Sequence, residues 1–101
     1  MKQYSVLISG TAQRMLTEHV FFLAGINPSA AEQLRVLLLD QVRSLSFMPE
    51  RFPYLTPEDR RSPYRKMFVP NNYLVLYVIE EDTVFVEYVL GCRSDYQWLL
   101  P

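Results

Sequence analysis

The sequence predicts an α+β fold, in which an N-terminal strand and an antiparallel helical hairpin precede a mainly antiparallel sheet, and the hairpin packs on one face of its four strands. Two observations support this prediction. The second half of the chain contains three runs rich in Val, Tyr, Phe, Leu and Ile, at 64–69, 73–79 and 83–90, separated by short polar breaks. The first half contains two stretches whose apolar residues recur at helical spacing.

The three apolar runs are interpreted as consecutive antiparallel strands, because the breaks between them are too short to hold a crossover helix. The breaks Pro70 to Asn72 and Glu80 to Asp82 are typical of hairpin turns. The acidic second turn is therefore interpreted as a solvated turn and not as a metal site. The alternating stretch from Gln3 to Ser9 predicts the fourth strand. Its place, at the sheet edge or beside the last strand, stays open at this stage.

The first helix is predicted to begin at Ala12, with Thr11 as its cap, and to end at Gly25. Its buried stripe consists of Ala12, Met15, Leu16, Val20 and Leu23. Phe21 and Phe22 widen this stripe beyond what one buried face needs. They predict that part of the helix contacts a molecule outside the domain.

The second helix is predicted to begin at Pro28 with Asn27 as its cap, while Ser29 and Glu32 offer a competing capping box. It runs to about Phe47. Its buried stripe consists of Leu34, Leu37, Leu38, Val42 and Leu45. Because only two or three residues join the two helices, they must pack as an antiparallel hairpin.

We expect residues 1–101 to form a single domain, because a chain of 101 residues of which 50% are apolar can bury one modest core. The single cysteine excludes an internal disulfide and a Cys-rich zinc site. No apolar run reaches the length of a membrane span. These features predict a cytoplasmic protein without a metal, a cofactor or a membrane partner.

The net charge of −1 argues against a global positive field that would attract a polyanion. The basic residues are nevertheless clustered, since four of the ten lie between positions 60 and 66, across the end of the proline-punctuated loop of residues 48–62 and the start of the next strand. These are Arg60, Arg61, Arg65 and Lys66. Because side chains alternate along a strand, only one of Arg65 and Lys66 can face a given side of the sheet.

Five segments, in order along nearly the whole chain, resemble the RelE/ParE superfamily of toxins from bacterial toxin–antitoxin operons. They are NPSAA at 27–31, LSFMPERFP at 45–53, YRKM at 64–67, NYLVLY at 72–77 and VLGCRSDY at 89–96. The resemblance is closer to the ParE-like branch and implies the same α+β fold.

The chain also departs from the family pattern at three places. Leu74 stands where members commonly carry an Arg on the concave face, and Met67 stands where RelE-like nucleases carry a second basic residue. The segment from Gly91 to Asp95 lacks the His and one Arg of the run that ends the last strand in many ParE-like members. The resemblance leaves four candidate catalytic residues, namely Arg65, Lys66, Arg93 and Tyr96.

The resemblance implies the toxin of a type II toxin–antitoxin (plasmid stabilisation) system, which inhibits growth. We expect it to bind a macromolecular target, which for ParE relatives is DNA gyrase, because the lost basic residues argue against tight binding to ribosomal RNA. Two alternatives stay open. One is a ribosome-dependent mRNA endonuclease, in which Arg65 and Arg93 steady the phosphate and Tyr96 donates a proton or stacks on a base. The other is a degenerate, non-toxic protein that retains only antitoxin binding.

All three alternatives imply a cognate antitoxin as partner. We expect it to cover apolar and basic surface around Phe21, Phe22, Arg60 and Arg61, and the pair to bind operator DNA only through the antitoxin. His19 lies near the apolar edge of the first helix and is interpreted as a packed or half-exposed residue and not as a general base.

Overall fold

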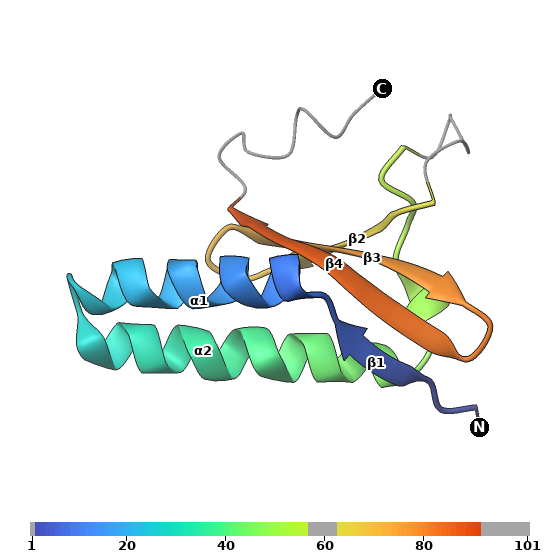
Figure 1. Cartoon of the computed structure of the whole chain (residues 1–101), viewed down its shortest axis with the longest axis horizontal. Coiled ribbons are helices and arrows are strands. Elements are labelled where there is room, and N and C mark those ends of the chain that lie inside the picture. The colour runs from blue at the N-terminus through green and yellow to red at the C-terminus, as the bar shows by residue number, and fades with distance from the viewer. Residues whose placement is uncertain (1, 57–62, 92–101) are drawn as a thin grey trace.

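A computed structural model describes residues 2–56 and 63–91 and confirms the predicted α+β fold (Figure 1). Its elements are, in chain order, β1 (Ser5–Ile8), α1 (Gly10–Ala24), α2 (Pro28–Arg43), the 3-10 turns η1 (Ser44–Ser46) and η2 (Pro49–Arg51), β2 (Arg65–Val69), β3 (Tyr73–Glu80) and β4 (Thr83–Gly91). The two helices lie on one side of the sheet, and the loop joining them is at the end opposite to the N-terminus (Figure 1).

The four strands form one sheet in the order β1-β4-β3-β2. β1 therefore lies both at a sheet edge and beside the last strand, and it runs parallel to β4, whereas the other pairs are antiparallel. A bulge interrupts the β3–β4 pairing, where Leu76 pairs with Tyr88 but Tyr77 pairs with Val86. The extra residue resets the alternation, so that both Val86 and Val89 face the helices.

The main core lies between the helical hairpin and the sheet. Its buried members are Ala12, Leu16, Leu34, Leu38, Val42, Leu45, Met67, Val69, Val75, Tyr77, Val84, Val86 and Val89. Both predicted helical stripes are confirmed, with Met15, Val20, Leu23 and Leu37 partly buried at its margin. The 3.6-residue period of each helix places these residues on the side that meets the sheet.

The face of the sheet that points away from the helices is also apolar. Leu74, Leu76 and Leu90 are buried there together with Leu55, and Tyr64 and Tyr88 pack against them. β3 is therefore buried on both faces, which explains why its sequence is a continuous apolar run and not an alternating one.

The start of α1 differs from the prediction, since the helix begins at Gly10 and Ser9 is its cap in place of Thr11. The Ser9 hydroxyl accepts a hydrogen bond from the Ala12 amide at 2.9 Å and donates one to the Glu87 carbonyl oxygen at 3.1 Å. The contact with the bulged strand thus orients Ser9 as the cap, while Thr11 stays exposed.

Two other boundaries were partly wrong. α2 ends at Arg43 and not near Phe47, because the chain tightens into the 3-10 turn η1. β1 is shorter than predicted, since Gln3 forms only an isolated bridge to Phe47. The cap of α2 is confirmed, because Asn27 Oδ1 accepts from the Ala30 amide at 3.1 Å.

Candidate interaction surfaces

The segment from residue 47 to residue 53 connects α2 to the sheet, and side chains from distant parts of the chain bind its carbonyl groups. The Tyr77 hydroxyl donates to the Pro49 carbonyl oxygen at 2.5 Å, from a ring that is 0% exposed. Burial raises the pKa of Tyr77 to about 12, against the opposing effect of the charges on Arg65 and Arg51. The hydroxyl is therefore a neutral, permanent donor at ordinary pH.

Arg65 is the second residue that holds this segment. Its Nη1 donates to the carbonyl oxygens of Phe52 at 2.7 Å and Glu50 at 3.2 Å. The guanidinium carbon also lies 4.1 Å from the centre of the Tyr54 ring. In this structure Arg65 thus holds backbone and an aromatic ring, which are structural contacts for a guanidinium.

Arg51 holds the strained corner of the same segment. Met48 has a φ of 46°, in the left-handed region that non-glycine residues rarely adopt. The Arg51 guanidinium donates to the carbonyl oxygens of Met48, at 3.1 Å, and of Phe47. It also donates to the Ser44 hydroxyl at 3.1 Å. These bonds offset the cost of the left-handed residue and leave the Met48 and Phe47 side chains exposed.

The predicted catalytic residues are not all within the described part of the chain. Lys66 lies on the opposite face of β2 from Arg65, as the alternation predicts, with its Nζ 5.8 Å from the centre of the Phe68 ring. Arg60, Arg61, Arg93 and Tyr96 lie outside the described residues. The geometry therefore does not bring Arg65 and Lys66 to a common anion site.

His19 is a packed residue, as predicted. Its Nε2 lies 2.8 Å from the Val89 carbonyl oxygen, and its ring meets the Tyr73 ring edge-on at 5.0 Å. Over residues 2–56 and 63–91, no three His, Cys, Asp or Glu side chains are grouped as metal ligands would be.

The loop end of the helical hairpin exposes three large apolar side chains. Phe21 is 79% exposed, Phe22 is 73% exposed and Ile26 is 70% exposed. We call these three residues the hairpin tip. The predicted exposure of both phenylalanines is thus confirmed, and Ile26 joins them because the helix ends just before it. Three exposed apolar side chains so close together indicate a contact surface for another molecule.

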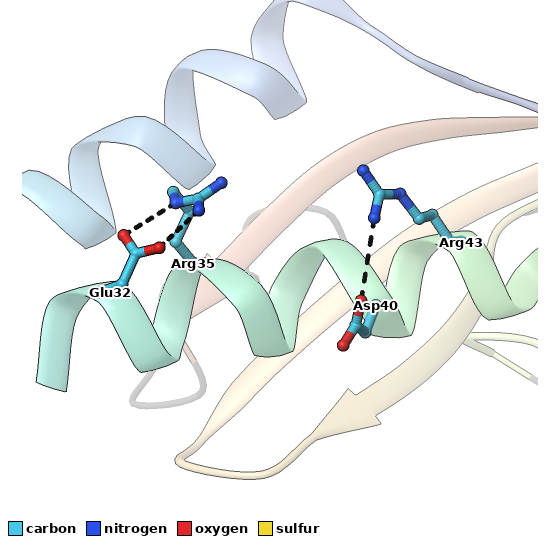
Figure 2. A network of polar contacts seen from close by, with 4 residues as sticks. All are labelled: Glu32, Arg35, Asp40 and Arg43. Carbon is cyan, nitrogen blue, oxygen red and sulfur yellow. Dashed lines mark hydrogen bonds and ion pairs between the residues drawn. The ribbon is translucent and has the colours of Figure 1, made fainter.

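A shallow groove of about 240 Å³ continues from Phe21 along the hairpin. Its lining consists of Leu16, Thr17, Val20, Phe21, Ala24 and Arg35. Figure 2 shows Arg35 on the side of α2 that faces α1, joined to Glu32 by hydrogen bonds of 2.6 and 3.1 Å. The hydrogen bonds from Arg35 lower the pKa of Glu32. The groove is apolar along α1 and has a neutralised ion pair at its rim.

A larger groove of about 590 Å³ lies between the hairpin and the turn that joins β2 to β3. It is lined by Leu23, Ala30, Gln33, Leu34, Leu37, Asn71 and Tyr73. Asn71 and Asn72 both have positive φ, of 74° and 68°, which asparagine tolerates in a tight hairpin turn. This turn places the Asn71 side chain at the rim of the groove.

Sequence reasoning missed the roles of Arg51 and Tyr77 and the groove beside Asn71. An arginine between two prolines and a tyrosine within an apolar strand are weak signals, since both patterns are common. The Asn71-Asn72 pair was recognised as a turn, but its neighbour in space lies on α2 and is far away in sequence.

The chain thus folds as a helical hairpin on one face of a four-stranded, mostly antiparallel sheet with a parallel N-terminal edge strand. Among the described residues, no helix is long and apolar enough to cross a membrane. The model of a family described as the ParE toxin of the type II toxin–antitoxin system parDE matches residues 6–96. The chain therefore belongs to the ParE toxin family, and membership of this family implies an antitoxin partner.

Solved structures confirm the fold. A chain of a chromosomal ParDE toxin–antitoxin system from P. aeruginosa superposes with a TM-score of 0.75 at 12% identity, covering 88% of this chain and 96% of that one. A conserved hypothetical protein from Helicobacter pylori, solved in solution, superposes with a TM-score of 0.56 at 15% identity, covering 90% and 96%. A search of curated protein sequences gives no match.

Proposed function

We propose that this chain is a growth-inhibiting toxin that acts in the cytoplasm by binding a protein target, with DNA gyrase as the expected target, and that a cognate antitoxin neutralises it. The observation that carries the proposal is the chemistry of the sheet face away from the helices. Of the described strand residues on this face, Leu74 and Leu76 are 0% exposed, Phe68 is 59% exposed, and Lys66 is the one cation. Such a face suits contact with protein, since an RNA site needs several cations for the phosphates.

The contacts of Arg65 also favour a protein-binding toxin over an mRNA endonuclease. Its guanidinium already binds the carbonyl oxygens of Glu50 and Phe52. These two bonds use both Nη1 donors and fix the guanidinium, so only its Nε and Nη2 donors would remain for a phosphate. Lys66 faces the other side, so the two cations cannot steady one phosphorane together.

We further propose that the antitoxin covers the hairpin tip and its groove, together with the basic residues Arg60 and Arg61, and that the pair binds operator DNA through the antitoxin. The exposure of Phe21 and Phe22 supports this proposal. An apolar surface of this kind in a free protein is an aggregation hazard that a tightly bound partner removes.

The decisive experiment is inducible expression of the chain alone, with labelled thymidine and labelled methionine followed separately. We expect DNA synthesis to stop first and the cells to filament. The purified chain should then inhibit supercoiling by purified gyrase. A first halt in protein synthesis with mRNA cut at codons would contradict the proposal, and Arg93→Ala should then abolish cutting.

Two controls make the result specific. Lys66→Ala should keep full toxicity, because the proposal gives Lys66 no phosphate to bind. Coexpression of the antitoxin from the same operon should restore growth. Normal growth despite abundant folded chain would instead support the degenerate, antitoxin-binding alternative.

A further inference from the structure

The two edges of the sheet are protected differently. The start of the β2 edge carries the charges of Arg65 and Lys66 and is covered by the chain itself, since the Lys66 amide donates to the Pro53 carbonyl oxygen at 3.0 Å and the Leu55 amide donates to the Tyr64 carbonyl oxygen at 2.8 Å. An isolated bridge between Tyr54 and Arg65 continues this cover. Covering an edge in this way prevents it from pairing with another chain.

The edge of β1 is covered only at its start. There the Tyr4 amide donates to the Ser46 carbonyl oxygen at 2.9 Å, on the side away from β4. The amides of Ser5 and Ser9 donate in the other direction, to the carbonyl oxygens of Asp82, just before β4, and of Val86 in β4, at 2.9 Å each. In a parallel pair the intervening residues direct both their amide and their carbonyl outward.

Val6 and Ile8 are these intervening residues. Their outward amides and carbonyls have no hydrogen-bond partner within residues 2–56 and 63–91. The strand from Ser5 to Ile8 contains neither a charge nor a proline, which are the usual protections of an edge. Leu7, between them, is 54% exposed and pairs with Phe85 of β4.

We propose that an extended segment of the antitoxin adds to the β1 edge as a fifth strand, through main-chain hydrogen bonds to Val6 and Ile8 and with an apolar side chain beside Leu7. This inference rests on the proposed function, because the family supplies the antitoxin as partner. It adds a second contact, on a different part of the toxin from the hairpin tip.

The length of the open edge selects this occupant over a second copy of the chain. Only three residues are open, between the Ser46 contact and the α1 cap, which allows about four main-chain hydrogen bonds. So few bonds do not offset the freedom lost when two folded chains associate. They suit one part of a long segment that wraps the toxin and gains affinity from several places at once.

The test is residue-resolved amide hydrogen exchange on the ¹⁵N-labelled chain, free and saturated with the unlabelled full-length antitoxin of its operon. In the free chain, we expect slow exchange at Ser5, Leu7 and Ser9 and fast exchange at Val6 and Ile8. In the complex, Val6 and Ile8 should slow by about tenfold or more. Ser5 and Ser9 serve as internal controls, because their amides already bind β4.

Three outcomes would overturn the inference. A saturated complex with unchanged exchange at Val6 and Ile8 would place the antitoxin elsewhere and leave the proposed function intact. Protection that rises with toxin concentration in the absence of antitoxin would assign the edge to self-association. Failure to form any complex would overturn the antitoxin assignment itself and the inference with it.

A pair of matched variants adds an affinity measurement. Leu7→Lys puts a charge at the centre of the open β1 edge, whereas Phe68→Lys puts one on β2, the edge strand at the other side of the sheet, at a side chain of similar exposure, 59% against 54%. Leu7→Lys should weaken antitoxin binding by about tenfold or more, as lysine blocks strand addition on natural edges. Equal weakening by both variants would contradict the inference.

Discussion

The hydroxyl of Tyr77 donates a 2.5 Å hydrogen bond to the carbonyl oxygen of Pro49, a residue 28 positions earlier in the chain. The bond joins the central strand to the segment that follows the helical hairpin. It makes Tyr77 a test of how strongly that segment is tied to the core.

Tyr77→Phe should lower the free energy of unfolding by about 1–2 kcal/mol, because the buried Pro49 carbonyl loses its donor while the ring still fills its place. Urea unfolding followed by far-ultraviolet circular dichroism measures this loss in the free energy of unfolding. Tyr73→Phe is the control, since the Tyr73 hydroxyl has no hydrogen-bond partner among the described residues. Equal losses in both variants would contradict the role assigned to the Pro49 bond.

The same residue predicts a loss of stability in alkali. The pKa of Tyr77 is raised from 10.0 to about 12 by burial, so below pH 10 its proton is held in both the folded and the unfolded chain. As pH rises through this window only the unfolded chain loses the proton, and the free energy of unfolding falls. Unfolding measured from about pH 9 to about pH 11.5 should show wild type losing about 2 kcal/mol more than Tyr77→Phe. Parallel pH curves would refute the prediction.

Arg65 and Lys66 are adjacent cations with different roles. Arg65→Met should cost about 1–3 kcal/mol, because it leaves the Glu50 and Phe52 carbonyls without their charged donor. Lys66→Met should change stability by less than about 0.5 kcal/mol. Thermal denaturation of the two variants side by side measures the difference. If Arg65→Met left the stability unchanged, the structural role of Arg65 would be contradicted, and the phosphate role that the nuclease alternative requires would gain support.

The cap of α1 can be tested with neighbouring hydroxyls. Ser9→Ala should destabilise the fold by about 1–2 kcal/mol, because the Ala12 amide and the Glu87 carbonyl both lose a partner. Thr11→Ala, at an exposed position inside the first turn, should be nearly neutral. Chemical denaturation measures the stability of both variants. A larger loss in Thr11→Ala than in Ser9→Ala would identify Thr11 as the cap.

The hairpin tip is predicted to matter for binding and not for folding. Phe21→Ser should weaken the antitoxin complex by about tenfold or more, since an exposed aromatic anchor carries much of an interface's energy. Its melting temperature should stay close to that of wild type, because the ring is 79% exposed in the free chain. Val36→Ser, at a less exposed site on α2, is the control. Calorimetric titration with antitoxin measures the affinity of each variant. Equal affinities for Phe21→Ser and Val36→Ser would contradict the proposal.

Local pattern was enough for much of the fold. The helical stripes around Leu16 and Leu38 and the turn at Asn71-Asn72 are confirmed, because each depends on residues close together in the chain. The Asn27 cap follows from the same local chemistry. The exposure of Phe21 and Phe22 was predictable too, since one buried face of a helix cannot contain every apolar residue of that stretch. Their part in binding stays a prediction.

The sequence by itself determined the order and type of the elements, the faces of the helices and the family to which the chain belongs. Only the tertiary structure decided that β1 runs parallel to β4, that Ser9 caps α1 and that Arg65 holds the Phe52 carbonyl. The reason is physical. Periodicity and capping act over a few neighbouring residues, whereas strand partners and the donors that satisfy loop carbonyls are chosen among groups that meet only after the chain has folded.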